Sequence, residues 1–227
     1  MRRIAILLAA IVAGVLVSTG VGLAASSGSQ QQTSSNKENT KVTVMTRNVY
    51  HGVDAEFAQA IAAPNFSKFL SATAAVYEGY HKRNFPERAA GLAAEIEETH
   101  PDVVGLQEAI KVRTDRPPNG TATLAEEVSL DYLQILLDKL QARGLHYEPV
   151  VESFNWDIEA PADENSDGIP DFELRHTDRV VTLIRTDGNS GLEVLDTNYG
   201  HFQMTSNCKL RTASNPTQPI EIVRGWT

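Results

Sequence analysis

Apolar residues alternate with polar ones, or recur every three to four positions, along most of the chain after residue 40. The alternation at its start predicts a β-strand over residues 41–46. Helical spacing of apolar residues then predicts an α-helix over 55–63, with Asp54 as its N-cap, and a second helix over 66–80. The domain is therefore expected to begin with one strand followed by helices.

A long helix leads directly into a short buried strand in the next part of the chain. Pro86 marks the start of the helix, which is predicted over residues 88–99. The strand is predicted over 102–108, because this segment is mostly apolar, follows a proline and ends on a carboxylate. A strand, a helix and a strand in this order imply a right-handed crossover between neighbouring parallel strands. Asn48 and Glu108 are therefore expected to lie at the same end of the sheet.

The second half of the chain is predicted to hold one more helix among strands and loops. This helix has the clearest periodicity, with four Leu residues on one face, and Gly144 ends it. The predicted elements in chain order are a loop at 113–123, this helix at 130–143, a strand at 146–154, an acidic loop at 157–171, a strand at 179–185, and shorter strands at 191–196, 201–204 and 220–223.

The first 40 residues differ from the rest of the chain. Arg2 and Arg3 precede an apolar run over 4–17, and small residues follow it. This order is typical of a secretory signal peptide, so we predict a signal over 1–25 and a secreted or periplasmic protein. An uncleaved membrane anchor is the alternative, because the segment is almost long enough to span a bilayer. Residues 26–40 are polar without apolar periodicity and are predicted to form a flexible linker.

Length and composition are those of one globular domain. The chain has 227 residues, of which 41% are hydrophobic, so a packed core is expected within residues 41–227. Cys208 is the only cysteine, which excludes an intramolecular disulfide. We expect a monomer with no obligate protein partner.

The acidic charge of the chain limits its partners. The formal net charge is −9, and loss of the two positive charges of Arg2 and Arg3 takes it to −11. An acidic protein is a poor general binder of polyanions. A phosphate-containing substrate must therefore meet a local metal ion or a local group of basic residues.

Glu108 is the first candidate for a metal ligand. It ends the predicted strand 102–108, and ligands and metals gather at the carboxyl ends of strands in layered α/β proteins. We predict that Glu108 binds a divalent cation. The alternatives are an exposed loop carboxylate for Glu108 and a simple turn residue for Asn48.

Three of the six histidines and two aromatic residues are expected to have no part in a site. His51, His81 and His100 are predicted to be solvated at the surface, and Tyr50 and Trp226 are predicted to pack in the core or at its rim.

Four segments together resemble the endonuclease/exonuclease/phosphatase superfamily: TRNVYHG, FPERAAGLAAEI, PDVVGLQEA and HTDRVVTLIR. The resemblance covers residues 41–227. It implies an α+β fold of the DNase I type, a four-layer α/β sandwich. It also implies hydrolysis of a phosphodiester or phosphomonoester by in-line attack of water, with Mg²⁺ as the cofactor and Mn²⁺ as an alternative. The substrate would be the phosphate ester of a nucleic acid, a lipid or a sugar.

The resemblance also implies roles for individual residues. Asn48 matches the family's first-strand asparagine, which lies beside the metal and orients the phosphate or the metal ligands, and Glu108 matches the metal-binding carboxylate. Asp178 resembles the acidic residue that orients the catalytic histidine. Arg179 and His176 flank Asp178 and are expected to face the phosphate.

Three later motifs of the family are not found together in this sequence: an Asn-Thr-His-like strand end, an Asp-x-Asn loop and a Ser-Asp-His. In the family they supply the general base and the groups that stabilise the transition state. We therefore expect the chain to be the amino-terminal part of the sandwich, inactive by itself, and the full-length protein to be the hydrolase. A sphingomyelinase-like lipid phosphodiesterase and a non-catalytic secreted binding protein with the same fold are the alternatives.

A second metal site is predicted in the acidic segment 163–171. Its oxygen-bearing residues have the spacing Asp-x-Asn-x-Asp-Gly-x-x-Asp and resemble the Ca²⁺ loops of thrombospondin type-3 and dockerin repeats. The ligands would be Asp163, Asn165, Asp167 and Asp171. Such a Ca²⁺ ion would order the loop and take no part in chemistry. The alternative is a solvated acidic loop.

Overall fold

A computed structural model of the chain describes residues 41–120, 122–188, 191–201, 209–212, 215–221 and 225–226. The predictions for the signal segment 1–25 and the linker 26–40 lie outside this part of the chain, as does most of the short strand predicted at 201–204. None of the helices in the described ranges is both long enough and apolar enough to cross a membrane.

The described residues form a mixed α+β structure, as predicted. Its first half contains β1 (Val44–Asn48), α1 (Asp54–Ile61), α2 (Phe66–Lys82), α3 (Phe85–Thr99), β2 (Val103–Gln107), β3 (Lys111–Asp115) and β4 (Glu127–Asp131). Its second half contains α4 (Tyr132–Gln141), β5 (Tyr147–Ala162), β6 (Phe172–Arg185), β7 (Gly200–His201), β8 (Lys209–Thr212), β9 (Asn215–Glu221) and β10 (Gly225–Trp226).

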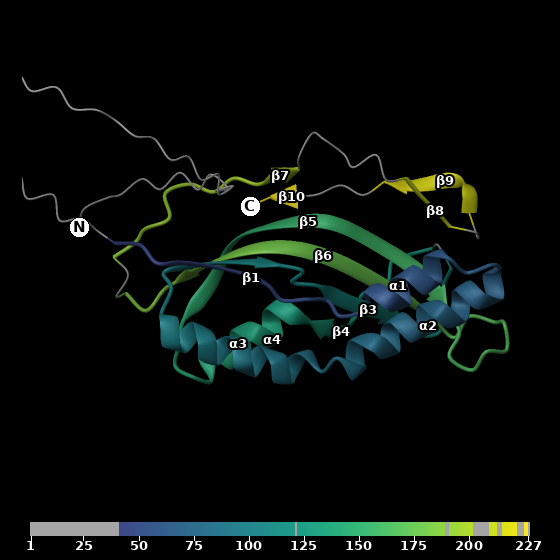
Figure 1. Cartoon of the computed structure of the whole chain (residues 1–227), viewed down its shortest axis with the longest axis horizontal. Coiled ribbons are helices and arrows are strands. Elements are labelled where there is room, and N and C mark those ends of the chain that lie inside the picture. The colour runs from purple at the N-terminus through teal and green to yellow at the C-terminus, as the bar shows by residue number, and fades with distance from the viewer. Residues whose placement is uncertain are drawn as a thin grey trace, which may run out of the picture.

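Six strands form the main sheet (Figure 1). β2 and β3 pair with successive parts of the long strand β6, and β5 pairs with β6 along its whole length. β1 extends the sheet beyond β2, and β4 extends it beyond β3. β1 and β2 are parallel, and Asn48 lies opposite Gln107 in their register. The parallel pairing of these two strands, expected from their order with α3 between them, is confirmed. All pairs that involve β6 are antiparallel. Two small ladders, β7 with β10 and β8 with β9, lie outside this sheet.

The core lies between the main sheet and its helices. Figure 1 shows α1 to α4 gathered on one side of the strands. Their apolar faces bury large side chains against alternate residues of β2 and β6, and the rings of Phe85 and Tyr132 stack with centroids 3.7 Å apart. The largest fully buried side chains include Tyr80, Tyr132, Phe85, Phe172, Leu70, Ile96, Leu106 and Leu136. Burial of each contributes about 1.5–3 kcal/mol to the hydrophobic driving force.

Side-chain caps begin two of the helices, but not the first. Asn65 accepts a hydrogen bond from the amide of Lys68 at the start of α2, and Asp131 accepts one from the amide of Gln134 at the start of α4. The prediction that Asp54 caps α1 is wrong, because Val53 holds that position without a side-chain cap. Asp54 is the first helical residue, where its negative charge still stabilises the helix by interacting with the helix dipole.

Two loops are shorter than predicted because some of their charged residues form parts of strands. Residues 113–115 of the predicted loop belong to β3, and residues 157–162 of the predicted acidic loop belong to β5. Cross-strand partners explain this: the Arg175 guanidinium of β6 lies 2.6 Å from the Asp157 carboxylate of β5. The strand predicted at 191–196 has no regular structure. Thus β5 and β6 are much longer than their apolar patterns indicate.

Candidate functional site

The candidate site lies where the chain leaves the sheet between β2 and β3. Both strands pair with β6, Leu106 opposite Val181 and Lys111 opposite Thr177. Between these pairs Glu108 has a positive φ of 58°, in the left-handed region that residues other than glycine seldom adopt. Such a conformation costs on the order of 1–3 kcal/mol and is found mainly at functional positions. The Glu108 side chain contacts the end of β1 and the loop that follows it.

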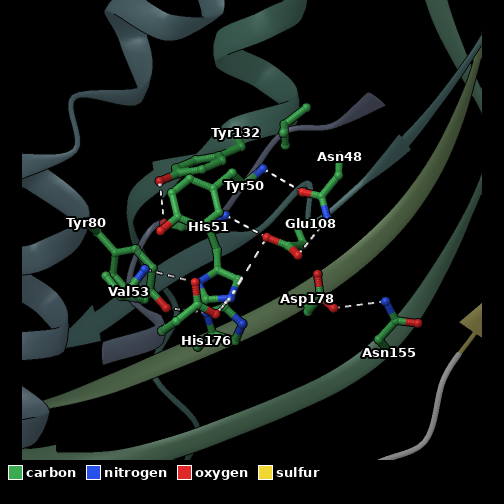
Figure 2. A network of polar contacts seen from close by, with 12 residues as sticks. Asn48, Tyr50, His51, Val53, Tyr80, Glu108, Tyr132, Asn155, His176 and Asp178 are labelled. Atoms are coloured by element: carbon green, nitrogen blue, oxygen red, sulfur yellow. Dashed lines mark hydrogen bonds and ion pairs between the residues drawn. The ribbon is translucent and has the colours of Figure 1, made fainter. Parts of the chain in front are cut away.

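Asn48 and Glu108 are in direct contact, as the strand order predicts (Figure 2). The Asn48 Nδ2 donates to Glu108 Oε1 at 2.7 Å, and the amide of Tyr50 donates to Asn48 Oδ1 at 2.8 Å. The amide of His51 donates to the other Glu108 oxygen at 2.8 Å. The carboxylate of Glu108 is therefore held by one side chain and one backbone amide from the loop that follows β1.

Arg88 of α3 holds that loop in place. Its guanidinium donates to the carbonyl oxygens of Val49 at 2.7 Å and Tyr50 at 3.0 Å. Gly52, with a φ of 88°, passes so close to Arg83 that an added Cβ would lie 2.8 Å from its side chain. Tyr50 itself is half exposed, so of the two predicted positions, core or rim, it takes the rim. The loop conformation depends on α3 and on a glycine.

His51 belongs to the site, although the sequence predicts a solvated surface residue. Its Nδ1 accepts from the amide of Val53 at 3.2 Å, so the proton of the neutral ring lies on Nε2. That nitrogen is 3.2 Å from the Asp54 carboxylate and 3.9 Å from that of Glu108. The only local signals for this arrangement are the spacing of three residues to Asp54 and the intervening Gly52. His81 and His100 are exposed, as predicted.

Asp178 of β6 adds a second carboxylate next to Glu108 (Figure 2). One of its oxygens accepts from Asn155 Nδ2 at 2.9 Å, and the other is buried without a hydrogen-bond partner. Burial raises the pKa of Asp178, and the negative charge of Glu108 raises it further, whereas the Asn155 hydrogen bond acts in the opposite direction. A cation at this place would stabilise both carboxylates.

His176 lies in the interior, in β6, which differs from the phosphate-facing position that the resemblance implies. Its Nδ1 is 2.6 Å from the hydroxyl of Tyr80, and its Nε2 is buried without a hydrogen-bond partner. The rings of Phe57 and Trp156 meet it edge to face, with centroids 5.3 and 5.4 Å away. Complete burial lowers the pKa of His176 to about 3, and the nearby charge of His51 contributes to the lowering. His176 therefore shapes the site from behind as a neutral ring.

The buried His176 should make folding stability depend on pH. The unfolded chain takes up this proton below about 6.5, but the folded protein does so only near pH 3. The contribution of neutral His176 to the free energy of unfolding is therefore fully present above about pH 6.5. It decreases as the pH falls below this value, by about 1.4 kcal/mol per pH unit for one proton. We expect His176→Gln to flatten the decline in urea-unfolding free energy between pH 7 and pH 5. The exposed His100→Gln is the control, and parallel profiles for wild type and His176→Gln would contradict the prediction.

Arg179 is buried and bound to protein groups, which differs from the phosphate-facing position expected from the sequence. Its Nε donates to the carbonyl oxygen of Ala109 at 2.8 Å. Its terminal nitrogens form ion pairs with Asp131 and, at 3.4 Å, with Glu152. Through its ion pair with Asp131, Arg179 therefore connects β6 to the start of α4. Among the predicted site residues, the structure brings together Asn48, Glu108 and Asp178.

Comparisons of the chain with protein-family models, with curated proteins and with solved structures found no match. The functional argument therefore rests on the geometry of this site.

The predicted calcium loop directs its oxygens toward its own backbone. Both Asp163 oxygens accept amide hydrogen bonds, from Ser166 at 2.6 Å and Gly168 at 2.8 Å. Asp171 accepts from the amide of Glu164 at 2.8 Å. Within the described ranges, no group of three or more His, Cys, Asp or Glu side chains is placed to hold a metal ion. Calcium binding by this loop stays a prediction.

Proposed function

We propose that the chain carries part of the active site of a secreted phosphoesterase that depends on a divalent metal, Mg²⁺ or Mn²⁺. The observation that carries this proposal is the Glu108 carboxylate, which directly follows β2 and is held by Asn48 and the His51 amide. The finer fold, a DNase I-like four-layer sandwich, belongs to the same proposal.

The residues at the site fit a hard dication. Mg²⁺ prefers oxygen ligands and uses only one or two protein carboxylates while it keeps several waters. Each oxygen of Glu108 accepts one hydrogen bond and retains a further lone pair. The unpartnered oxygen of Asp178 adds negative charge beside it. When bound, the metal would polarise the phosphoryl group and neutralise developing negative charge.

The protein groups around Glu108 have separate tasks in this proposal. Asn48 and the backbone of His51 orient the metal-binding carboxylate, and Arg88 keeps their loop in position. His51 presents Nε2–H, which lies 3.2 Å from the Asp54 carboxylate, as a donor to a phosphate oxygen. His176 and Arg179, which are buried, support the site from the interior.

A direct test is Mn²⁺ binding to the 227-residue chain, measured by electron paramagnetic resonance with Mg²⁺ as competitor. We expect saturable binding at one site that Mg²⁺ displaces. Hydrolysis of bis(p-nitrophenyl) phosphate is then measured in the full-length protein, and EDTA should abolish it. Absence of Mn²⁺ binding would refute the metal site. Metal binding without hydrolysis would favour the non-catalytic binding protein.

A further inference from the structure

An apolar cavity of about 280 Å³ lies between helices α1 and α2 and strands β5 and β6. Its wall includes Phe57 and Ile61 of α1, Phe69 and Val76 of α2, Trp156 of β5 and Leu174 of β6. Several lining residues, among them Trp156 and Ile158, are only partly buried, so the cavity opens to solvent. A mostly apolar concave site of this kind is typical of ligand-binding pockets.

The cavity wall contains few polar groups, and most of its residues are apolar. The Thr73 hydroxyl donates to the carbonyl oxygen of Phe69 at 2.9 Å, and one Glu159 oxygen accepts from the amide of Ala125 at 2.5 Å. The Nε2 atom of the fully buried His176 has no hydrogen-bond partner. A charged or strongly polar ligand would lose its hydration here without compensation. The ligand group that fits is uncharged and apolar.

The size of the cavity limits the apolar group that it can hold. A dry apolar cavity of 150 Å³ binds benzene, so about 280 Å³ accommodates roughly ten carbon atoms by the same ratio. Complete burial of such a chain would contribute about 0.8 kcal/mol per methylene group.

The cavity and the candidate site share a wall of aromatic rings. His176 and Phe57 line the cavity, and their ring centroids lie 6.2 and 5.8 Å from that of His51. His51 Nε2 in turn lies 3.9 Å from the Glu108 carboxylate. The ring of His51 therefore lies between the Glu108 carboxylate and the two rings that line the cavity.

We propose that this cavity binds the alkyl chain of the substrate, so that the protein acts on a lipid-like phosphate ester with a chain of about ten carbons. The phosphate part of this assignment rests on the proposed function, whereas binding of the chain does not. The acidic net charge of −9 agrees with it, because such a protein does not attract long polyanions such as nucleic acids.

The experiment measures binding of n-alkanols and n-decyl phosphate by isothermal titration, with tryptophan fluorescence as a second readout because Trp156 lines the cavity. Affinity for alkanols should rise with chain length and level off near ten carbons. Ala60→Leu, which adds three carbons to the cavity wall, should weaken decanol binding at least about 10-fold. Ala58→Leu, the same change on the exposed side of α1, should have no effect. Ala160→Leu fills the cavity from β5 and replaces Ala60→Leu if that variant does not fold.

The outcomes separate the cavity from the metal site. No alkanol binding, or equal affinities for wild type and both filling variants, would overturn the proposal. Decyl phosphate binding that tightens with Mg²⁺ would support both the cavity and the proposed function. Decanol binding with no effect of Mg²⁺ on decyl phosphate would support an apolar ligand site, remove its assignment to a phosphate ester and count against the proposed function.

Discussion

Glu108→Gln should abolish divalent-metal binding while leaving the fold intact. The glutamine can keep one of the contacts with Asn48 Nδ2 and the His51 amide through its carbonyl oxygen, but its NH2 group cannot accept the other hydrogen bond. It also lacks the negative charge that a hard dication requires. Changes in groups that merely orient metal ligands typically reduce affinity 10–100-fold, so loss of the ligand itself should reduce Mn²⁺ affinity by at least about 100-fold. Hydrolysis by the full-length protein should fall by a similar factor or more.

Stability measurements on the same variant separate a metal-binding carboxylate from a structural one. Without metal, Glu108 is repelled by Asp178, so neutralising it should leave the unfolding free energy unchanged within about 1 kcal/mol or raise it slightly. Mg²⁺ should then raise the melting temperature of the wild type but not of the variant. Glu98→Gln, an equal charge change on the exposed face of α3, is the control. Unchanged Mn²⁺ affinity in Glu108→Gln would remove Glu108 from the metal site.

Arg179→Met should be the most destabilising of the charge changes considered. The guanidinium is 5% exposed and neutralises Asp131, whose side chain is 16% exposed. Burial acts to raise the pKa of Asp131, but the charge and hydrogen bond of Arg179 outweigh it and lower this pKa. Removal of one partner of a buried ion pair leaves an uncompensated charge and costs about 3–5 kcal/mol. Because Lys111 remains 3.2 Å from Asp131, we expect a value near the lower end, about 3 kcal/mol.

Urea unfolding of three variants tests this assignment. Asp131→Asn added to Arg179→Met should restore part of the loss, because asparagine keeps the N-cap of α4 without the charge. Arg143→Met removes an exposed ion pair with Glu97 and should cost less than about 1 kcal/mol. If Arg179→Met unfolds like wild type but loses hydrolysis in the full-length protein, Arg179 acts on the substrate, as the sequence resemblance implies.

The local pattern of apolar residues was sufficient to predict the helices and the contact between Asn48 and Glu108. The apolar spacing in α2, α3 and α4 predicts each helix to within a few residues. Asn48 and Glu108 could be brought together from the sequence, because each follows a short strand and one helix separates the strands. The crossover rule then determines that both lie at the same sheet end.

The length of β5 and β6 depends on their pairing with each other, and so does the position of His176 and Asp178 in β6. Residues 172–178 of β6 include His176, Asp178 and several charged side chains, and their alternation is not apolar. They form a strand because partners such as Asp157 satisfy them from β5. A pattern of apolar residues cannot reveal such partners, since they lie far away in the sequence.

By itself, the sequence determined the acidic character of the protein, its helices, and the pairing of Asn48 with Glu108. Only the tertiary structure decided that His51 faces Glu108, that Arg179 is bound in the interior, and that His176 separates the site from an apolar cavity. The physical reason is that periodicity reports which face of an element is buried. Which polar group meets which, and where space is left between elements, depends on how elements distant in sequence pack together.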